Sequence, residues 1–279
     1  MTKFGICLIQ NFTGTDKTQN ENRAMDLIRR AVQKYKPRLV ALPECFNAPY
    51  INEAFEPNAE LVPTGSTCMK MSSIAKELSI YLVGGIMERD PKNPKTIYNT
   101  ATVWGPDGSL ITKHRKVHLY DFYGAVGFKE SATLTPGDDI TTFMIDDVKV
   151  GVAICYDISS PEFMMCYKMA GVDLMVVPMA YDHVCWGPKF WELIGRARAF
   201  DTQVYFAEIS GARNTDISKY VLYGYTHLVD PFGHIMVQAA EQEEILHSEL
   251  DFDEVKRARR EITKTAHRRT DIYDRYLRK

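Results

Sequence analysis

The stretch Val150–Phe163, VGVAICYDISSPEF, decides how this sequence is interpreted. Its first five residues are nearly all apolar and predict a strand that is buried on both faces. Cys155 follows at once, and residues 160–162, SPE, are typical of a helix N-cap and first turn. A cysteine placed between a strand end and a helix start lies near backbone N–H groups, which favour a thiolate. Cys155 is therefore either a nucleophile at the tip of a turn or one more buried thiol.

Short apolar runs alternate with longer helical patterns on both sides of this stretch. GPDG at 105–108 and VDPFG at 229–233 favour hairpins. Apolar strands combined with hairpins indicate packed sheets with helices outside them. Because no linker, repeat or low-complexity segment interrupts the pattern, we expect one α/β domain over residues 1–279. Strands are expected at 3–10, 38–44, 80–86, 99–104, 110–116, 149–155, 172–178 and 203–209, and helices at 20–37, 68–79, 160–171 and 189–202.

Composition excludes several classes of protein. The chain of 279 residues is 45% hydrophobic and 25% charged, with a net charge of -2, so general affinity for nucleic acid is not expected. No apolar run approaches the roughly 20 residues that span a bilayer, and the N-terminus does not resemble a signal peptide. Six cysteines without C-x-x-C spacing argue against zinc ribbons, redox dithiols and disulfides. We expect a cytoplasmic protein with free thiols.

The segment from about residue 252 onward has a composition of its own. It carries ten Lys or Arg residues against five Asp or Glu. One interpretation is a basic arm for RNA or membrane, and the other is a solvated helix with an arm that packs on a neighbouring subunit. Ile262, Ile272, Tyr273 and Tyr276 favour packing, and no base-stacking platform of known type is present.

Two other stretches bear on Cys155. ALPECFNAPY, residues 41–50, places Glu44 at the end of a β-rich run, and KHRKVHLYDF, residues 113–122, places Lys116 just after another strand. Taken alone, Glu44 would be a surface or paired carboxylate, and Lys116 part of a solvated basic cluster. His118, His227 and His234 lie in strand or hairpin contexts and form no pair among themselves four residues apart that would indicate zinc.

Taken together, the three stretches resemble the nitrilase, or carbon–nitrogen hydrolase, superfamily. They read LPE at 42–44, RKVHL at 115–119 and GVAICYD at 151–157, and the resemblance continues through GPKFWELIGRARAFDTQVYF and YGYTHLVDPFG. It implies a four-layer α-β-β-α sandwich that is dimeric or larger. It also implies a Glu–Lys–Cys triad and a second glutamate, Glu130 in GFKESATLTPG, that orients Lys116 and the substrate.

Three groups of these types can hydrolyse an amide. Cys155 would attack, with its thiol pKa lowered by the adjacent Lys116. Glu44 would take the thiol proton and later give it to ammonia. Lys116 and the Tyr156 backbone N–H would hold the oxyanion. The substrate would be a small-molecule amide together with water, and neither a metal nor an organic cofactor is required.

Several stretches look most like the ω-amidase branch, which hydrolyses dicarboxylate monoamides such as α-ketoglutaramate or succinamate. The branch usually has an arginine four residues after the nucleophile, where this chain has Ser159. Asp182 could instead pair with a cationic substrate group, or His183 could replace the arginine. The alternatives are that Asp182 is only a loop carboxylate and that Trp186 plugs the pocket. The remaining expected pocket residues are Phe46 and Tyr50, either of which could equally be core, and Tyr181 and Trp186.

Other functions remain open at this stage. An N-carbamoyl amidase, a deaminated-glutathione amidase and a nitrilase share the triad and differ only in the pocket. A scaffold protein of the same fold without activity is a further alternative, against which the intact Glu44, Lys116, Glu130 and Cys155 argue.

Overall fold

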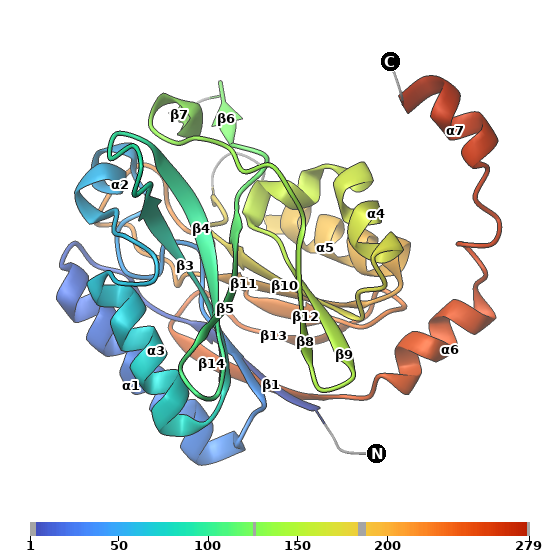
Figure 1. The fold of residues 1–279 in the computed structure, drawn as a ribbon, viewed down its shortest axis with the longest axis horizontal. Helices are drawn as coiled ribbons and strands as arrows, with labels where there is room; N and C mark the ends of the chain where they lie inside the picture. The colour runs from blue at the N-terminus through green and yellow to red at the C-terminus, as the bar shows by residue number, and fades with distance from the viewer. Residues whose placement is uncertain (1–3, 125–126, 184–187, 278–279) are drawn as a thin grey trace.

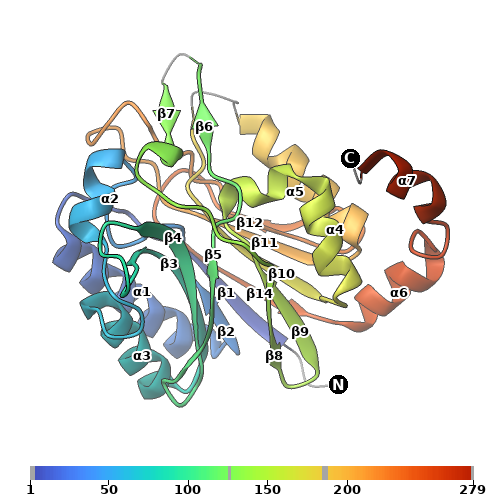
Figure 2. The same cartoon turned by 45° about the horizontal axis from the view of Figure 1, so that its top comes forward.

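Two six-stranded sheets lie face to face, with helices on both outer faces (Figures 1 and 2). The computed structural model describes residues 4–124, 127–183 and 188–277. The layers run helix, sheet, sheet, helix, so the expected four-layer α-β-β-α sandwich is confirmed.

In the first sheet, the strand at residues 4–10 pairs with the strand at residues 244–250. Helices α1 (Lys17–Tyr35) and α3 (Ser66–Leu78) cover its outer face, and the short α2 (Asn52–Asn58) lies at one end. β1 pairs in parallel with β2 and antiparallel with β14. The strand order is β14 (Glu244–Leu250), β1 (Phe4–Gln10), β2 (Leu39–Ala41), β3 (Tyr81–Arg89), β4 (Ile97–Trp104) and β5 (Leu110–Arg115).

The second sheet carries the nucleophile segment. Helices α4 (Pro161–Met169) and α5 (Pro188–Thr202) lie on its outer face. β10 pairs in parallel with both β9 and β11, and its six residues are all buried. The strand order is β13 (Ile235–Gln238), β12 (His227–Val229), β11 (Tyr205–Ser210), β10 (Leu174–Met179), β9 (Val148–Val152) and β8 (Thr141–Ile145).

Strand alternation distributes the apolar residues between two cores. In β1, Ile6 and Leu8 face the second sheet, whereas Cys7 and Ile9 face helices α1 and α3. The buried residues of β9 and β10 belong to a core that also includes residues of α4 and α5, such as Tyr167 and Trp191. Because both faces of the central strands are covered, these strands read as continuous apolar runs, as the sequence predicts.

Several expected elements differ in extent. The strand expected at 38–44 ends at Ala41, and the one expected at 149–155 ends at Val152. Ser160 caps α4 as expected: its side chain accepts a hydrogen bond from Phe163 N, and Pro161 is the first helical residue. The sequence patterns did not predict β8, β14, α2 or the small β6–β7 hairpin (Asp121–Phe122 and Phe128–Lys129).

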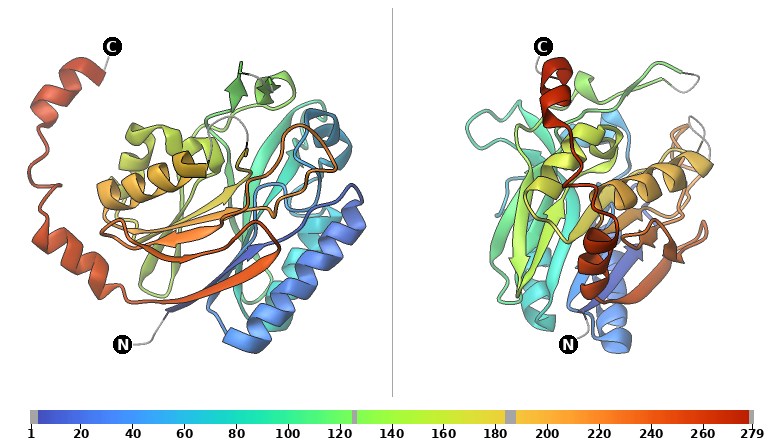
Figure 3. Two further views of the ribbon diagram at one scale, coloured as in Figure 1. Left: turned by 180° about the vertical axis from the view of Figure 1, so that it is seen from behind. Right: turned by 90° about the vertical axis from the view of Figure 1, so that its right-hand side faces the viewer.

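The C-terminal segment leaves the body of the molecule. α6 (Asp253–Glu261) follows β14, and a loop then leads to α7 (Thr270–Leu277), which projects away from the sandwich (Figure 3). Among the residues described, no helix has the length and hydropathy needed to cross a membrane.

Candidate active site

Glu44 lies in a turn beyond the end of β2. The turn places the next residue, Cys45, in the left-handed region at a φ of 50°, and Glu44 itself is buried. Gly85 on β3 allows this close approach, because a Cβ there would lie 2.7 Å from Glu44 Cα. The Glu44 carboxylate is thereby held inside the protein at the end of the first sheet.

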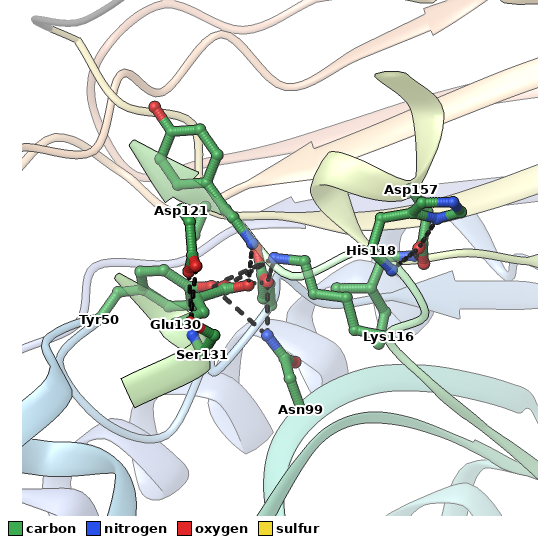
Figure 4. A network of polar contacts seen from close by, with 12 residues as sticks. Tyr50, Asn99, Lys116, His118, Asp121, Glu130, Ser131 and Asp157 are labelled. Atoms are coloured by element: carbon green, nitrogen blue, oxygen red, sulfur yellow. Dashed lines mark hydrogen bonds and ion pairs between the residues drawn. The ribbon is translucent and has the colours of Figure 1, made fainter. Parts of the chain in front are cut away.

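Lys116 continues the line of β5 and enters the same interior. Its backbone N–H donates to Asn99 O at 2.8 Å, and its side chain is buried. Lys116 Nζ lies 2.7 Å from Glu130 Oε1 (Figure 4). It also lies 2.9 Å from Glu44 Oε1, so one ammonium group bridges two carboxylates.

Glu130 is the first residue of a short 3₁₀ turn, η1 (Glu130–Ala132), and is fully buried. Its Oε2 accepts the Tyr120 backbone N–H at 2.6 Å. Its Oε1 contacts Lys116 Nζ and, very closely, the Tyr50 hydroxyl. Both oxygens of this carboxylate are therefore occupied by protein groups.

The two oxygens of Glu44 differ from each other. Oε1 accepts from Asn99 Nδ2 at 2.6 Å and lies 2.9 Å from the Tyr50 hydroxyl, in addition to its ion pair with Lys116. Oε2 is buried and has no hydrogen-bond partner among the described residues. A buried carboxylate oxygen without a partner is costly, and here it is the acceptor left available to a reacting group.

Cys155 begins a second 3₁₀ turn, η2 (Cys155–Ser159), directly after the buried Ile154. Its φ of 45° lies in the left-handed region, which costs a non-glycine residue of the order of 1 kcal/mol. Strain of this kind persists only where the surroundings impose it. The expected turn after the strand is present, with a 3₁₀ turn between Cys155 and α4.

Burial has the largest effect on the pKa of Cys155. It raises the pKa of the Cys155 thiol well above its usual value; Glu44 adds to the increase, while Lys116 and a backbone hydrogen bond from Ala180 oppose it. Lys116 thus lowers this pKa as expected, but desolvation and the Glu44 charge outweigh the ammonium, so the net pKa is raised. The raised pKa favours the protonated thiol near neutral pH.

The pKa values of Lys116 and Glu130 are also shifted. Burial disfavours the charged form of Lys116, but Glu130 and Glu44 outweigh it, and the net pKa of Lys116 is raised. Burial raises the pKa of Glu130, with Lys116 opposing and Glu44 adding to the shift. The raised pKa favours the cationic form of Lys116.

Aromatic rings surround the carboxylates and Lys116. Tyr50 packs against Phe128 with ring centroids 5.5 Å apart, and Tyr120 packs edge-on against Tyr156 at 5.1 Å. Tyr220 contacts Phe128 at 4.6 Å. Two of the expected pocket residues, Tyr50 and Tyr156, therefore belong to the aromatic cluster around Lys116 and the two glutamates.

Other expected pocket residues lie elsewhere. Phe46 is packed in the core between the first sheet and helices α1 and α3, which is the alternative left open for it. Tyr181 is fully buried and stacks on Trp191 of α5 with ring centroids 4.3 Å apart, so it packs against a helix of the outer layer. Ser159 Oγ is buried and has no hydrogen-bond partner among the described residues.

The segment after Tyr181 runs outward. Asp182 is fully buried and forms an isolated bridge with Leu222. His183 is exposed, and its ring stacks on Tyr223 with centroids 5.9 Å apart. Trp186 lies outside the described residues. Within the described part of the chain, no group of three His, Cys, Asp or Glu side chains is arranged to hold a metal ion.

Sequence reasoning missed Asn99 and Asp157. Asn99 is a buried amide inside an apolar strand, and Asp157 is a fully buried carboxylate two residues after Cys155. The signal for Asn99 was a polar residue in the run IYNTATVW, and the signal for Asp157 was its place in the CYD motif.

The model of the carbon-nitrogen hydrolase family matches residues 6–260. The chain belongs to this family. It is therefore a hydrolase that acts on carbon–nitrogen bonds other than peptide bonds.

Similar carbon–nitrogen hydrolases match over nearly the whole chain. The omega-amidase NIT2 of Mus musculus is 42% identical over 98% of both chains, and that of Homo sapiens is 40% identical over the same shares. The crystal structure of Saccharomyces cerevisiae Nit3, a member of branch 10 of the nitrilase superfamily, is 41% identical. It superposes with a TM-score of 0.87 over 96% of this chain and 97% of that one.

Proposed function

We propose that this protein is a cysteine-dependent, ω-amidase-like amidohydrolase that cleaves the C–N bond of a small carboxamide through a thioester. One observation carries the proposal: Lys116 bridges Glu44 and Glu130, and Glu44 keeps one buried oxygen without a partner. That oxygen is the base that the protonated Cys155 thiol requires.

The reaction proceeds in two halves. Glu44 Oε2 takes the thiol proton as Cys155 Sγ bonds to the carbonyl carbon, and Lys116 Nζ and the Tyr156 N–H hold the oxyanion. The tetrahedral adduct collapses, its C–N bond breaks, and Glu44 gives the proton to the leaving ammonia. Water then attacks the thioester while Glu44 takes a proton from it. The acid leaves, and the thiol regains that proton.

The relatives named omega-amidase support dicarboxylate monoamides such as α-ketoglutaramate and succinamate as substrates. Ser159 stands where that branch usually has an arginine, so the substrate carboxylate needs another partner here. The small-molecule substrate, rather than nucleic acid or a membrane, is the partner we assign.

Ammonia release over a panel of amides tests the proposal. The panel contains α-ketoglutaramate, succinamate, glutamine, asparagine, one neutral amide, one cationic amide and one nitrile, with Cys155→Ala as the control. We expect turnover of the first two and none in Cys155→Ala. Retained turnover in that variant would contradict the mechanism, and turnover confined to another amide would assign a different acyl group.

We further propose a cytoplasmic homodimer or larger homo-oligomer formed by one domain over residues 1–279. The described cysteines are free, as a reducing compartment requires. Tyr276 on the projecting α7 is 68% exposed, and Leu193 on α5 is also 68% exposed, which supports a second copy as their cover. Light scattering on the full chain and on Tyr276→Ser measures the assembly. A monomeric full chain would overturn this proposal.

A further inference from the structure

Asp157 lies where the segment after Lys116 meets the turn that carries Cys155 (Figure 4). It is fully buried, although it touches neither Glu44 nor Glu130. Its hydrogen bonds go to backbone and histidine groups that flank the catalytic residues in the sequence.

One carboxylate oxygen holds the lysine segment. Asp157 Oδ1 accepts the backbone N–H of Val117 at 3.1 Å and that of His118 at 2.8 Å, and His118 Nδ1 lies 2.9 Å away. Val117 and His118 directly follow Lys116. The path of the backbone after the catalytic lysine is therefore fixed by this oxygen.

The other oxygen holds the nucleophile segment. Asp157 Oδ2 accepts the backbone N–H of Ile154 at 3.0 Å, and Ile154 directly precedes Cys155. His114 Nε2, from β5, lies 3.0 Å from the same oxygen. A single carboxylate thus joins β5, the lysine segment and the strained turn, which come from two different sheets.

The charge of Asp157 is suited to this arrangement. Burial alone would raise its pKa, but hydrogen bonds from His114, His118 and Ile154 outweigh burial and hold the pKa well below its usual range. An ionised carboxylate only accepts hydrogen bonds, so the facing nitrogens of both imidazoles carry hydrogen.

We propose that Asp157 is a positioning residue that fixes the register between Lys116 and Cys155. This inference rests on the proposed function, in which Lys116 binds the oxyanion that Cys155 creates. Without Asp157, the two segments would be joined only by weaker contacts, and the thiol would move relative to the ammonium and to Glu44.

The first test replaces Asp157 with asparagine. Asp157→Asn puts an NH₂ group where an acceptor is needed, so at least one of the N–H donors around it loses its bond. A misplacement of about 1 Å lowers rate by roughly 100-fold, and we expect kcat to fall by about that factor with KM close to wild type. Alkylation of Cys155 by chloroacetamide should slow as well.

The matched control is Glu21→Gln on α1. Glu21 is also a buried carboxylate, bonded to Thr67 Oγ1 at 2.6 Å and Lys70 Nζ at 2.7 Å, but it lies on the outer side of the first sheet. The Glu21→Gln substitution should lower the melting temperature and leave kcat and the rate of Cys155 alkylation unchanged. The same kcat and alkylation rate in Asp157→Asn as in this control would overturn the proposal.

His118→Ala keeps the inference testable if Asp157→Asn does not fold. The His118 side chain is 35% exposed, and its loss removes one donor to Oδ1. We expect kcat to fall by roughly tenfold, the equivalent of one hydrogen bond to a charged group. A wild-type kcat in this variant would count against the register role. Turnover in Cys155→Ala would instead contradict the proposed function itself.

Discussion

Strands β4 and β5 carry two buried charge clusters, one on each face of the first sheet. On the inner face, Lys116 and Asn99 meet Glu44. On the outer face, Lys113, Arg115 and Thr100 meet Glu88 of β3. Adjacent residues thus enter opposite clusters, because side chains alternate along a strand.

The two clusters differ in their balance of charge. Glu88 has two cations, and although burial raises its pKa, hydrogen bonds from Arg115, Lys113 and Thr100 give a net lowering. In the inner cluster one ammonium faces two carboxylates, and the pKa of Glu130 is raised. The excess of cations satisfies both oxygens of Glu88, whereas the excess of carboxylates leaves Oε2 of Glu44 without a partner among the described residues.

The largest effect should come from the paired substitutions Lys116→Met and Lys113→Met. Losing Lys116 removes the oxyanion donor, and we expect kcat to fall by about 10³-fold or more. Losing Lys113 removes a partly exposed ion pair, and we expect the free energy of unfolding to fall by less than about 1 kcal/mol with kcat intact. Steady-state kinetics and urea unfolding of both variants measure these two effects. Equal losses of kcat would contradict the distinction between the inner and the outer cluster.

A smaller contrast is expected between Glu130→Gln and Glu88→Gln. Glu130→Gln weakens the hold on Lys116, so kcat should fall by roughly 10²-fold. Glu88→Gln leaves kcat unchanged and lowers the free energy of unfolding by about 2 kcal/mol, since it removes charge from several hydrogen bonds. Kinetics and denaturant midpoints distinguish the two. Loss of kcat in Glu88→Gln would show that the outer cluster also supports catalysis.

The same pair should respond to pH with opposite signs. The folded pKa of Glu88 is lowered, so its stabilisation is present above the unfolded value of about 4.3 and is lost as pH falls through the folded pKa. The advantage of the wild type over Glu88→Gln should therefore vanish in acid. The folded pKa of Glu130 is raised, so ionisation opposes folding, and Glu130→Gln should gain stability relative to wild type as pH rises above about 4.3. Urea midpoints of the wild type and both variants across pH measure how each stability difference depends on pH. The same pH dependence for both variants would contradict the prediction.

The smallest contrast is expected from removing one hydroxyl at each cluster. Tyr50→Phe takes away the group that contacts both Glu44 and Glu130, and kcat should fall by roughly tenfold. Thr100→Val removes the hydroxyl that donates to Glu88 at 2.8 Å and should cost about 1 kcal/mol of unfolding free energy with no change in kcat. The controls are each variant's melting curve and kcat at saturating amide. An unchanged kcat in Tyr50→Phe would show that the Tyr50 hydroxyl does not contribute to catalysis and that the residue contributes only its ring packing.

The central strands and the layer order could be predicted from sequence because strands buried on both faces are continuous apolar runs. β14 could not be predicted in this way. Its sequence EILHSEL mixes polar and apolar residues, and it pairs with β1, more than 200 residues away. The sequence pattern also could not predict on which face of the first sheet Phe46 packs, since an apolar residue suits either face of a sheet covered on both sides.

The candidate catalytic groups could be named from motifs, but their electrostatics could not. Residue type and order pointed to Glu44, Lys116, Glu130 and Cys155. The direction of the Cys155 pKa shift depends on how burial and the Glu44 charge compare with Lys116, and only the folded arrangement sets that comparison. Asn99 and Asp157 act through hydrogen-bond partners that no spacing rule reveals.

The pairing of β1 with β14 has a consequence for biosynthesis. Phe4 to Gln10 emerge from the ribosome more than 200 residues before their partners at 244–250. Until then one edge of an apolar strand has no neighbour, and such an edge invites pairing with other chains. Any message truncated before codon 244 would release a nascent chain with this edge open. We expect such fragments to aggregate or to depend on chaperones, because the strand pairing leaves this edge open.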